Sequence, residues 1–248
     1  MCPERRGLLE FKSLMPSFFP PPNPRLAIAP ARVLTCAPGA GPDMQDFEGF
    51  ILTGGASSRM GLDKSRLRIG GHTFVERINE ALRPLARRVC VVSSREDADT
   101  HGLPVVRDLY EGRGALGGVH AALARCTAQW AFIVSCDLPF VTRELFERLA
   151  SFALSNDADA VAPIQDDGRQ QPLCALYATT ACRATAEELI RIDDLRPRAL
   201  LWRVRTRWVA FDELSDLDGS ELFFENVNTP EDYEKAKGKR QKAKIKSE

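Results

Sequence analysis

The stretch GFILTGGASSRMGLDK runs from Gly49 to Lys64 and decides the fold. Its first five residues are mostly apolar and predict a short buried strand over 49–53. A loop rich in Gly and Ser follows directly, with Arg59 and Lys64 behind it. Glycines let backbone N–H groups approach phosphate oxygens closely, and the two cations supply the charge that a triphosphate needs. The stretch therefore predicts a phosphate-binding loop at the end of a strand.

The spacing in this loop differs from two common nucleotide-binding motifs. Gly54 and Gly61 are too far apart for the pattern G-x-x-x-x-G-K-[ST], and Lys64 lies too far beyond the second of them. The loop does not match G-x-G-x-x-G either. An ordinary Gly/Ser turn is the alternative interpretation, but such a turn needs no paired Arg and Lys.

Composition limits the class of protein. The chain has 248 residues, with 34 Lys and Arg against 34 Asp and Glu, so its formal net charge is zero. Proteins that bind nucleic acids or membrane surfaces usually carry a basic excess, so neither partner is expected. No run of about 18 uncharged apolar residues is present, and the seven cysteines include no C-x-x-C. We therefore expect a cytoplasmic enzyme or ligand-binding domain with reduced cysteines.

The two ends of the chain differ from its middle. Nine of the 16 prolines precede residue 43, and no periodic apolar pattern occurs there. We expect residues 1–43 to be a disordered extension or a mis-assigned start, with Met44 as the natural beginning. Residues 44–237 carry the expected folded domain. Residues 238–248 are Lys-rich and are expected to form a basic disordered tail.

Predicted strands and helices alternate along the folded domain. Strands are expected over 49–53, 88–93, 103–107, 130–136, 158–164, 173–177 and 207–211, and helices over 73–85, 117–126, 144–154 and 181–190. This alternation is typical of βαβ units, and unbroken apolar strands indicate burial on both faces. The sequence predicts an α/β fold with a mostly parallel sheet and helices on both faces. Ligands of such sheets bind at the carboxyl ends of the strands.

Two aspartates follow predicted strands directly. Asp108 comes after the strand 103–107 and before a glycine-rich stretch that opens a helix, an arrangement that suits a nucleoside or a phosphate. Asp137 comes after the strand 130–136, and Pro139 fixes the chain two residues later. Mg²⁺ takes one or two carboxylates together with substrate phosphates, so Asp137 is the predicted metal ligand. Simple capping or strand termination is the alternative for each aspartate.

Together these segments resemble the molybdenum cofactor guanylyltransferase family, a group of nucleotidyltransferases with a Rossmann-like fold. The resemblance covers residues 48–237 and rests on Leu52 to Lys64, on Asp108 with its glycine-rich stretch, on Cys136-Asp137-Leu138-Pro139, on Gly168 to Tyr177 and on Asn226-Val227-Asn228-Thr229-Pro230-Glu231. Two positions depart from the family pattern. Thr53 stands where Ala is usual, and Ala115 stands where Pro is usual.

The resemblance implies a reaction. The chain would transfer GMP from GTP to the terminal phosphate of molybdopterin, or of Mo-molybdopterin, and release pyrophosphate. The product would be the guanine dinucleotide form of the molybdenum cofactor. Related cytidylyltransferases typically carry Ala-Ala-Gly where this chain has Thr53-Gly54-Gly55, so the second position favours guanine. The attacking phosphate is already ionised near neutral pH, so no general base is required.

The resemblance also assigns roles residue by residue. The GTP-binding set would be Leu52, Thr53, Gly54, Gly55, Lys64, Asp108 and Asp137, with Leu52, Thr53 and Gly54 beside the guanine and Asp108 at the guanine or ribose. Lys64, Arg59 and Asp137 would be catalytic. Mg²⁺ would be held by Asp137, with Asn228 as a further candidate ligand. Arg169 and Gln171 would face the second substrate, and the later arginines Arg196, Arg198, Arg203 and Arg205 are further candidates for it.

Two alternatives stay open at this point. One is transfer of CMP to molybdopterin or to another phosphorylated small molecule. The other is a non-catalytic GTP-binding adapter that acts with molybdoenzyme maturation proteins. The joint presence of Lys64 and Asp137 favours catalysis, because a pure binder needs no metal ion at the α-phosphate.

Overall fold

The structure is a computed structural model. It describes residues 46–53, 67–95, 100–110, 112–155, 157–229, 231–235 and 238. The expected extension over residues 1–43, and the expected tail apart from Gly238, lie outside the described residues. In the part of the chain that the structure describes, no helix has both the length and the apolar character needed to cross a membrane.

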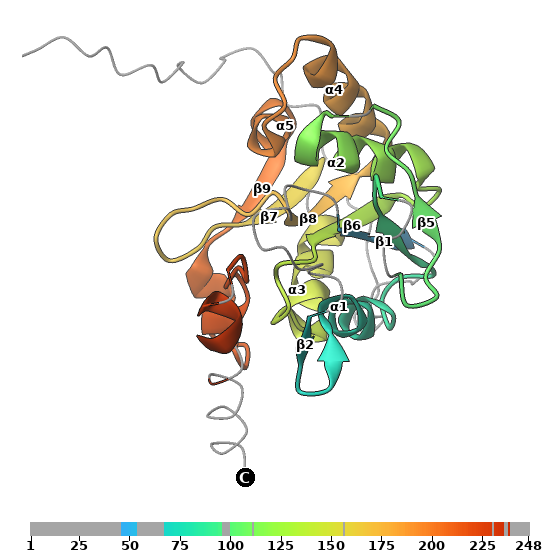
Figure 1. The fold of residues 1–248 in the computed structure, drawn as a ribbon. Helices are drawn as coiled ribbons and strands as arrows, with labels where there is room; N and C mark the ends of the chain where they lie inside the picture. Colours follow the sequence, from blue (N-terminus) through green and yellow to red (C-terminus); the bar gives the residue numbers. More distant parts are fainter. Residues whose placement is uncertain are drawn as a thin grey trace, which may run out of the picture. The chain divides into compact units, whose positions relative to one another are not determined.

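A seven-stranded sheet organises the fold, in the order β5-β4-β1-β6-β8-β7-β9 (Figure 1). Its strands are β1 (Phe47–Leu52), β4 (Val89–Val92), β5 (Val105–Val106), β6 (Trp130–Ser135), β7 (Ala160–Pro163), β8 (Cys174–Ala178) and β9 (Thr206–Val209). Neighbouring strands pair in parallel, except that β8 is antiparallel to both β6 and β7. The predicted mostly parallel sheet is confirmed. The amino end of β8 consequently lies at the same edge as the carboxyl ends of the other strands.

Helices cover both faces of this sheet (Figure 1). The helices α1 (Phe74–Leu82) and α3 (Arg143–Ser155) pack on one face, and α2 (Gly114–Arg125), α4 (Thr179–Arg191) and α5 (Pro197–Arg203) pack on the other. Two short 3₁₀ helices, η4 (Phe211–Glu213) and η5 (Ser220–Leu222), follow β9. This layering confirms the predicted α/β class.

The side chains of β1 show why the strands are apolar at nearly every position. Phe47 and Ile51 lie in the core cluster with α1 and α3, whereas Phe50 and Leu52 lie in the cluster with α2, α4 and α5. Successive side chains of a strand point to opposite faces, so a strand covered on both sides buries all of them. Gly49 is placed where a Cβ would come within 3.1 Å of Leu82 Cδ1, so the absence of a side chain lets α1 approach the sheet closely.

Several small elements are not expected from the sequence, among them a hairpin and a short helix. The strands β2 (Arg68–Ile69) and β3 (His72–Thr73) form a separate antiparallel hairpin. Its turn residues Gly70 and Gly71 have φ values of 60° and 90°, which glycine adopts without strain. The helix α5 is also not expected, and it begins with a proline in its first turn.

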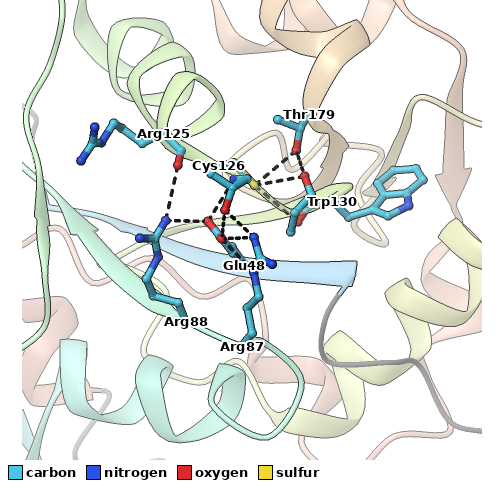
Figure 2. A network of polar contacts seen from close by, with 9 residues as sticks. Glu48, Arg87, Arg88, Arg125, Cys126, Trp130 and Thr179 are labelled. Atoms are coloured by element: carbon cyan, nitrogen blue, oxygen red, sulfur yellow. Dashed lines mark hydrogen bonds and ion pairs between the residues drawn. The ribbon is translucent and has the colours of Figure 1, made fainter.

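The edge that holds the amino end of β1 carries a buried carboxylate (Figure 2). Glu48 is 1 % exposed. It accepts hydrogen bonds from Arg87 Nη2 at 2.7 Å, from Arg88 Nη2 at 2.9 Å and from Thr127 Oγ1 at 2.8 Å. Burial is the largest single influence and raises the pKa of Glu48, but these hydrogen bonds together outweigh it and hold the pKa below its usual value. The network ties β1 to the segments that follow α1 and α2.

Candidate functional site

Four parallel strands end side by side at the opposite edge of the sheet. Their hydrogen bonds continue just past the strand ends, from Thr53 N to Val92 O at 3.0 Å, from Ser93 N to Val106 O at 3.1 Å and from Cys136 N to Leu52 O at 3.0 Å. The residues that directly follow β1, β4, β5 and β6 therefore lie in one row along the edge of the sheet. Leu52, Thr53, Asp108 and Asp137 all lie in or next to this row, as the sequence predicts.

The side chains of Leu52 and Asp108 meet the first half of α2 at Gly118. A Cβ on Gly118 would lie 2.5 Å from Leu52 Cδ2 and 3.8 Å from Asp108 Oδ1. The missing side chain thus lets the helix approach the ends of β1 and β5. The helix itself begins at Gly114, three residues before the predicted start at Gly117, so the glycine-rich stretch supplies its first turn.

Asp108 has the properties of a binding residue. Its Oδ1 atom is buried and has no hydrogen-bond partner among the described residues. Burial raises the pKa of this carboxyl. A buried carboxylate oxygen without a donor is costly, and a bound molecule with an N–H or O–H group would remove that cost. The site around Leu52, Gly118 and Asp108 therefore suits the hydrogen-bonding groups of a nucleoside.

Asp137 lies two residues beyond β6, in a turn that three hydrogen bonds fix in place. Leu138 N donates to Ser135 O at 3.2 Å, and Val227 N donates to Asp137 O at 2.9 Å. Arg77 Nε, from α1, donates to Pro139 O at 2.7 Å. The Oδ1 atom of Asp137 is buried and lacks a partner within the described part of the chain. A fixed carboxylate oxygen of this kind fits a Mg²⁺ ion that takes its other ligands from phosphates and water.

Arg77 is a residue that the sequence analysis did not single out. It lies in α1, and its guanidinium carbon is 5.9 Å from the centre of the Phe140 ring. Together with the bond to Pro139, this contact attaches the turn that carries Asp137 to the helix. Sequence periodicity places Arg77 on the polar side of a helix and gives no sign of this contact.

The segment with Asn228 lies beside Asp137, because Val227 bonds to it directly. Thr229 Oγ1 accepts the N–H of Asp232 at 3.1 Å, which caps the helical residues 231–235. The Asp232 carboxylate accepts in return from the backbone of Asn228 and Thr229 at 3.1 and 3.0 Å. Helix capping therefore explains part of this segment, and Asn228 directly follows the residue that bonds to Asp137.

The segment that precedes β8 reaches the same edge from the other side of β6. Ser135 N donates to Leu173 O at 2.8 Å, and Gln171 N donates to Pro163 O at 3.0 Å. Gln165, which the sequence analysis did not single out, is buried and donates from Nε2 to Phe224 O at 3.3 Å. Arg169 is exposed at the tip of this hairpin and pairs with Asp167 at 2.6 Å.

Two of the later arginines form ion pairs with carboxylates near them. Arg205 pairs with Asp157 and Asp159 at the amino ends of β7 and β9, which is the edge opposite the site. Arg196 makes a bidentate ion pair with Asp194.

The predicted phosphate-loop residues Gly54, Gly55, Arg59 and Lys64 lie outside the described residues.

Comparison with known proteins gives consistent results. The family model of the MobA-like NTP transferase domain matches residues 49–206. A probable molybdenum cofactor guanylyltransferase of Carboxydothermus hydrogenoformans is 33% identical over 196 residues, which cover 77% of this chain and 95% of that protein. A second, from Pelotomaculum thermopropionicum, is 34% identical over 199 residues, or 78% of this chain and 93% of that one. The crystal structure of molybdopterin-guanine dinucleotide biosynthesis protein A from Archaeoglobus fulgidus matches with a TM-score of 0.68 and 26% identity, over 79% of this chain and 99% of that one.

Proposed function

Because the chain belongs to the MobA-like NTP transferase family, we propose that it transfers GMP from GTP to the terminal phosphate of molybdopterin. Its relatives are named molybdenum cofactor guanylyltransferases, which favours GMP over CMP and catalysis over a binding role alone. The observation that carries the proposal is the row of strand ends. Asp108 and Asp137 each present a buried carboxylate oxygen that no described group satisfies.

The nucleoside of GTP would bind on the β1, β4 and β5 side of this row. Leu52 offers an apolar contact next to Gly118, and Asp108 Oδ1 accepts a hydrogen bond from the guanine or the ribose. Thr53, Gly54 and Gly55 follow at the end of β1 and would continue this border toward the phosphates. Lys64 and Arg59 would offset the phosphate charge.

Asp137 would hold Mg²⁺ at the junction between the two substrates, with Asn228 as a candidate for a further ligand. When bound, the ion offsets negative charge on the phosphates that must approach each other. The turn that carries Asp137 is fixed by Val227 and Arg77, so its carboxylate is positioned before substrate arrives.

The transfer itself is a displacement at phosphorus. An oxygen of the molybdopterin phosphate forms a bond to the α-phosphorus of GTP, and the bond from that phosphorus to the bridging oxygen of the β-phosphate breaks. The electron pair leaves with pyrophosphate. The attacking oxygen is already ionised near neutral pH, so the side chains only have to position the two substrates and offset charge. Lys64 and Arg59 would act on the leaving pyrophosphate.

The second substrate would approach from the β8 side of the same row. The hairpin over 165–173 lies there, joined to β6 through Leu173 and to the 224–229 segment through Gln165. Gln171 and Arg169 would meet the pterin or its phosphate, with Arg169 leaving its exposed pair with Asp167 to do so.

Pyrophosphate release tests the proposal directly. The purified chain is incubated with Mg²⁺, molybdopterin and either GTP or CTP, and pyrophosphate and the dinucleotide product are measured. We expect release with GTP that depends on molybdopterin. Faster release with CTP would move the chain to the cytidylyl branch. Binding of GTP, seen as a rise in melting temperature, without any release would indicate an adapter.

A further inference from the structure

Thr53 makes two hydrogen bonds to a single carbonyl oxygen. Its backbone N–H donates to Val92 O at 3.0 Å, and its hydroxyl Oγ1 donates to the same oxygen at 3.1 Å. A carbonyl oxygen has two lone pairs, so both acceptor sites of Val92 O are used. An alanine at this position could make only the first of these bonds. The hydroxyl is thus an additional link between the ends of β1 and β4.

This link lies where the ends of several strands border the same helix. The Cβ position of Gly118 is within 3.8 Å of both Val92 Cγ1 and Asp108 Oδ1, and it is 2.5 Å from Leu52 Cδ2. Leu52 immediately precedes Thr53, and Val92 is the last residue of β4. A change in the spacing of β1 and β4 at Thr53 would therefore move Leu52 relative to Asp108.

The direction of the bond also limits what the hydroxyl can do. A hydroxyl group has one proton to donate, and the proton of Thr53 is directed to Val92 O. Toward a ligand the oxygen can only accept. The side chain is therefore suited to holding the strand ends, and it is not available to donate a hydrogen bond to a nucleotide.

We propose that Thr53 is a positioning residue, whose hydroxyl acts through Val92 to fix the spacing of Leu52 and Asp108 that the nucleoside requires. This inference rests on the proposed function, because it assumes that the nucleoside of GTP binds at these two residues. Thr53 then affects how tightly GTP binds and has little effect on the chemical step.

The test compares Thr53→Val, which keeps the shape and removes the hydroxyl, with Thr53→Ser, which keeps the hydroxyl. For Thr53→Val we expect a KM for GTP that is about three- to tenfold higher, as the loss of one such bond implies. The value of kcat and the KM for molybdopterin stay near those of the unaltered protein. Thr53→Ser restores the KM for GTP. Thr53→Ala serves as a second hydroxyl-free variant if Thr53→Val does not fold.

Thr179→Val is the matched control. Thr179 Oγ1 lies 2.8 Å from Ala128 O and 3.2 Å from Cys126 Sγ at the opposite edge of the sheet, so its loss removes hydroxyl hydrogen bonding far from the strand ends of the site. We expect Thr179→Val to lower the melting temperature as Thr53→Val does, without changing the KM for GTP. An equal effect of both variants on KM, or no effect of Thr53→Val and Thr53→Ala, would overturn the inference.

The test distinguishes a failure of the positioning role of Thr53 from a failure of the proposed function. If the unaltered protein releases no pyrophosphate, the proposed function fails, and the affinity for GTP is then read from thermal stabilisation. Weaker stabilisation by GTP in Thr53→Val than in Thr53→Ser would still support the positioning role. Equal stabilisation in the two variants would reject it. A fall in kcat at an unchanged KM would also reject it, because it would place Thr53 in contact with the reacting groups.

Discussion

The backbone N–H of Val227 donates a hydrogen bond of 2.9 Å to the carbonyl oxygen of Asp137. These residues belong to segments that are far apart in the sequence, and the bond brings the Asn228 segment next to the turn after β6. The bond uses the backbone of Asp137, and the Oδ1 atom of its carboxylate has no partner among the described residues. The turn is fixed through its backbone, so the side chain can be altered without removing the contacts that shape it.

Asp137→Asn should therefore change activity far more than folding. The amide keeps the size of the side chain but removes the charge that would hold Mg²⁺, so pyrophosphate release at saturating GTP and Mg²⁺ should fall by about 100-fold or more. The melting temperature should change little. Asp157→Asn, at the opposite edge of the sheet, is the control and should leave turnover unchanged. Turnover close to that of the unaltered protein in Asp137→Asn would refute the metal assignment.

Asp108→Asn should make the protein more stable and bind GTP more weakly. The pKa of Asp108 is raised by burial, so the ionised carboxylate costs stability, and this cost grows as the pH rises through the folded-state pKa. The gain in melting temperature should be present at pH 8 and should shrink as the pH is lowered toward 4. Melting curves across this range, with and without GTP, measure both effects. A variant that is less stable than the unaltered protein at pH 8 would contradict the prediction.

Glu48→Gln should destabilise the fold without changing the kinetics. The change removes the charge that pairs with Arg87 and Arg88, whose side chains reach solvent, so the free energy of unfolding should fall by about 2 kcal/mol, as expected for the loss of hydrogen bonds to a charged group. The pKa of Glu48 is lowered, so its contribution is complete above the pKa of the unfolded chain and is lost as the pH falls through the folded-state pKa. Urea unfolding at pH 7 and at pH 4 should show a smaller difference between the proteins at the lower pH. An unchanged free energy of unfolding at pH 7 would count against the role assigned to this network.

Arg77→Met should slow turnover by loosening the turn that carries Asp137. The loss of one hydrogen bond to Pro139 O predicts a several-fold effect, on the order of three- to tenfold. More Mg²⁺ should be needed for half-maximal activity. Arg77→Lys keeps the charge and should recover part of the loss. Arg143→Met removes an exposed pair with Glu147 on α3 and is the control. If Arg77→Met shows an unaltered Mg²⁺ dependence, the positioning role of Arg77 is wrong.

The central strands and the place of the site could be predicted from the sequence because their signals are local. The strands β1 and β6 are continuous apolar runs, and Thr53 and Asp137 follow them closely. Parallel strands end at one edge, so residues that are distant in the sequence could be expected together. The elements and side-chain roles that the sequence does not predict depend on contacts between separate elements. The helix α5 has only seven residues, too few to show periodicity, and it is stabilised by Ala199, Leu200 and Leu201 in the core.

The contributions of Arg77 and Gln165 could not be read from the sequence for the same reason. Each acts through a side-chain bond to a carbonyl oxygen about 60 residues away, at Pro139 and Phe224. For Arg205 the sequence suggests a role that the structure does not support. The sequence makes Arg205 a candidate for binding an anionic substrate, but the pairing of β9 with β7 places it at the edge of the sheet opposite the site, where Asp157 and Asp159 neutralise its charge. Only the topology of the sheet determines such a placement.

The reversed strand β8 has a consequence for how proteins of this kind can diversify. It divides the edge of the sheet that carries the candidate site into two halves that meet at β6. One half is built from the ends of β5, β4 and β1, and the other from the β7–β8 hairpin. In the proposed function the first half selects the nucleotide and the second selects the acceptor. A change in hairpin length or composition can then alter the acceptor while the nucleotide half stays intact. Asp137, in the turn that follows the shared strand β6, is the part that both kinds of change have to preserve.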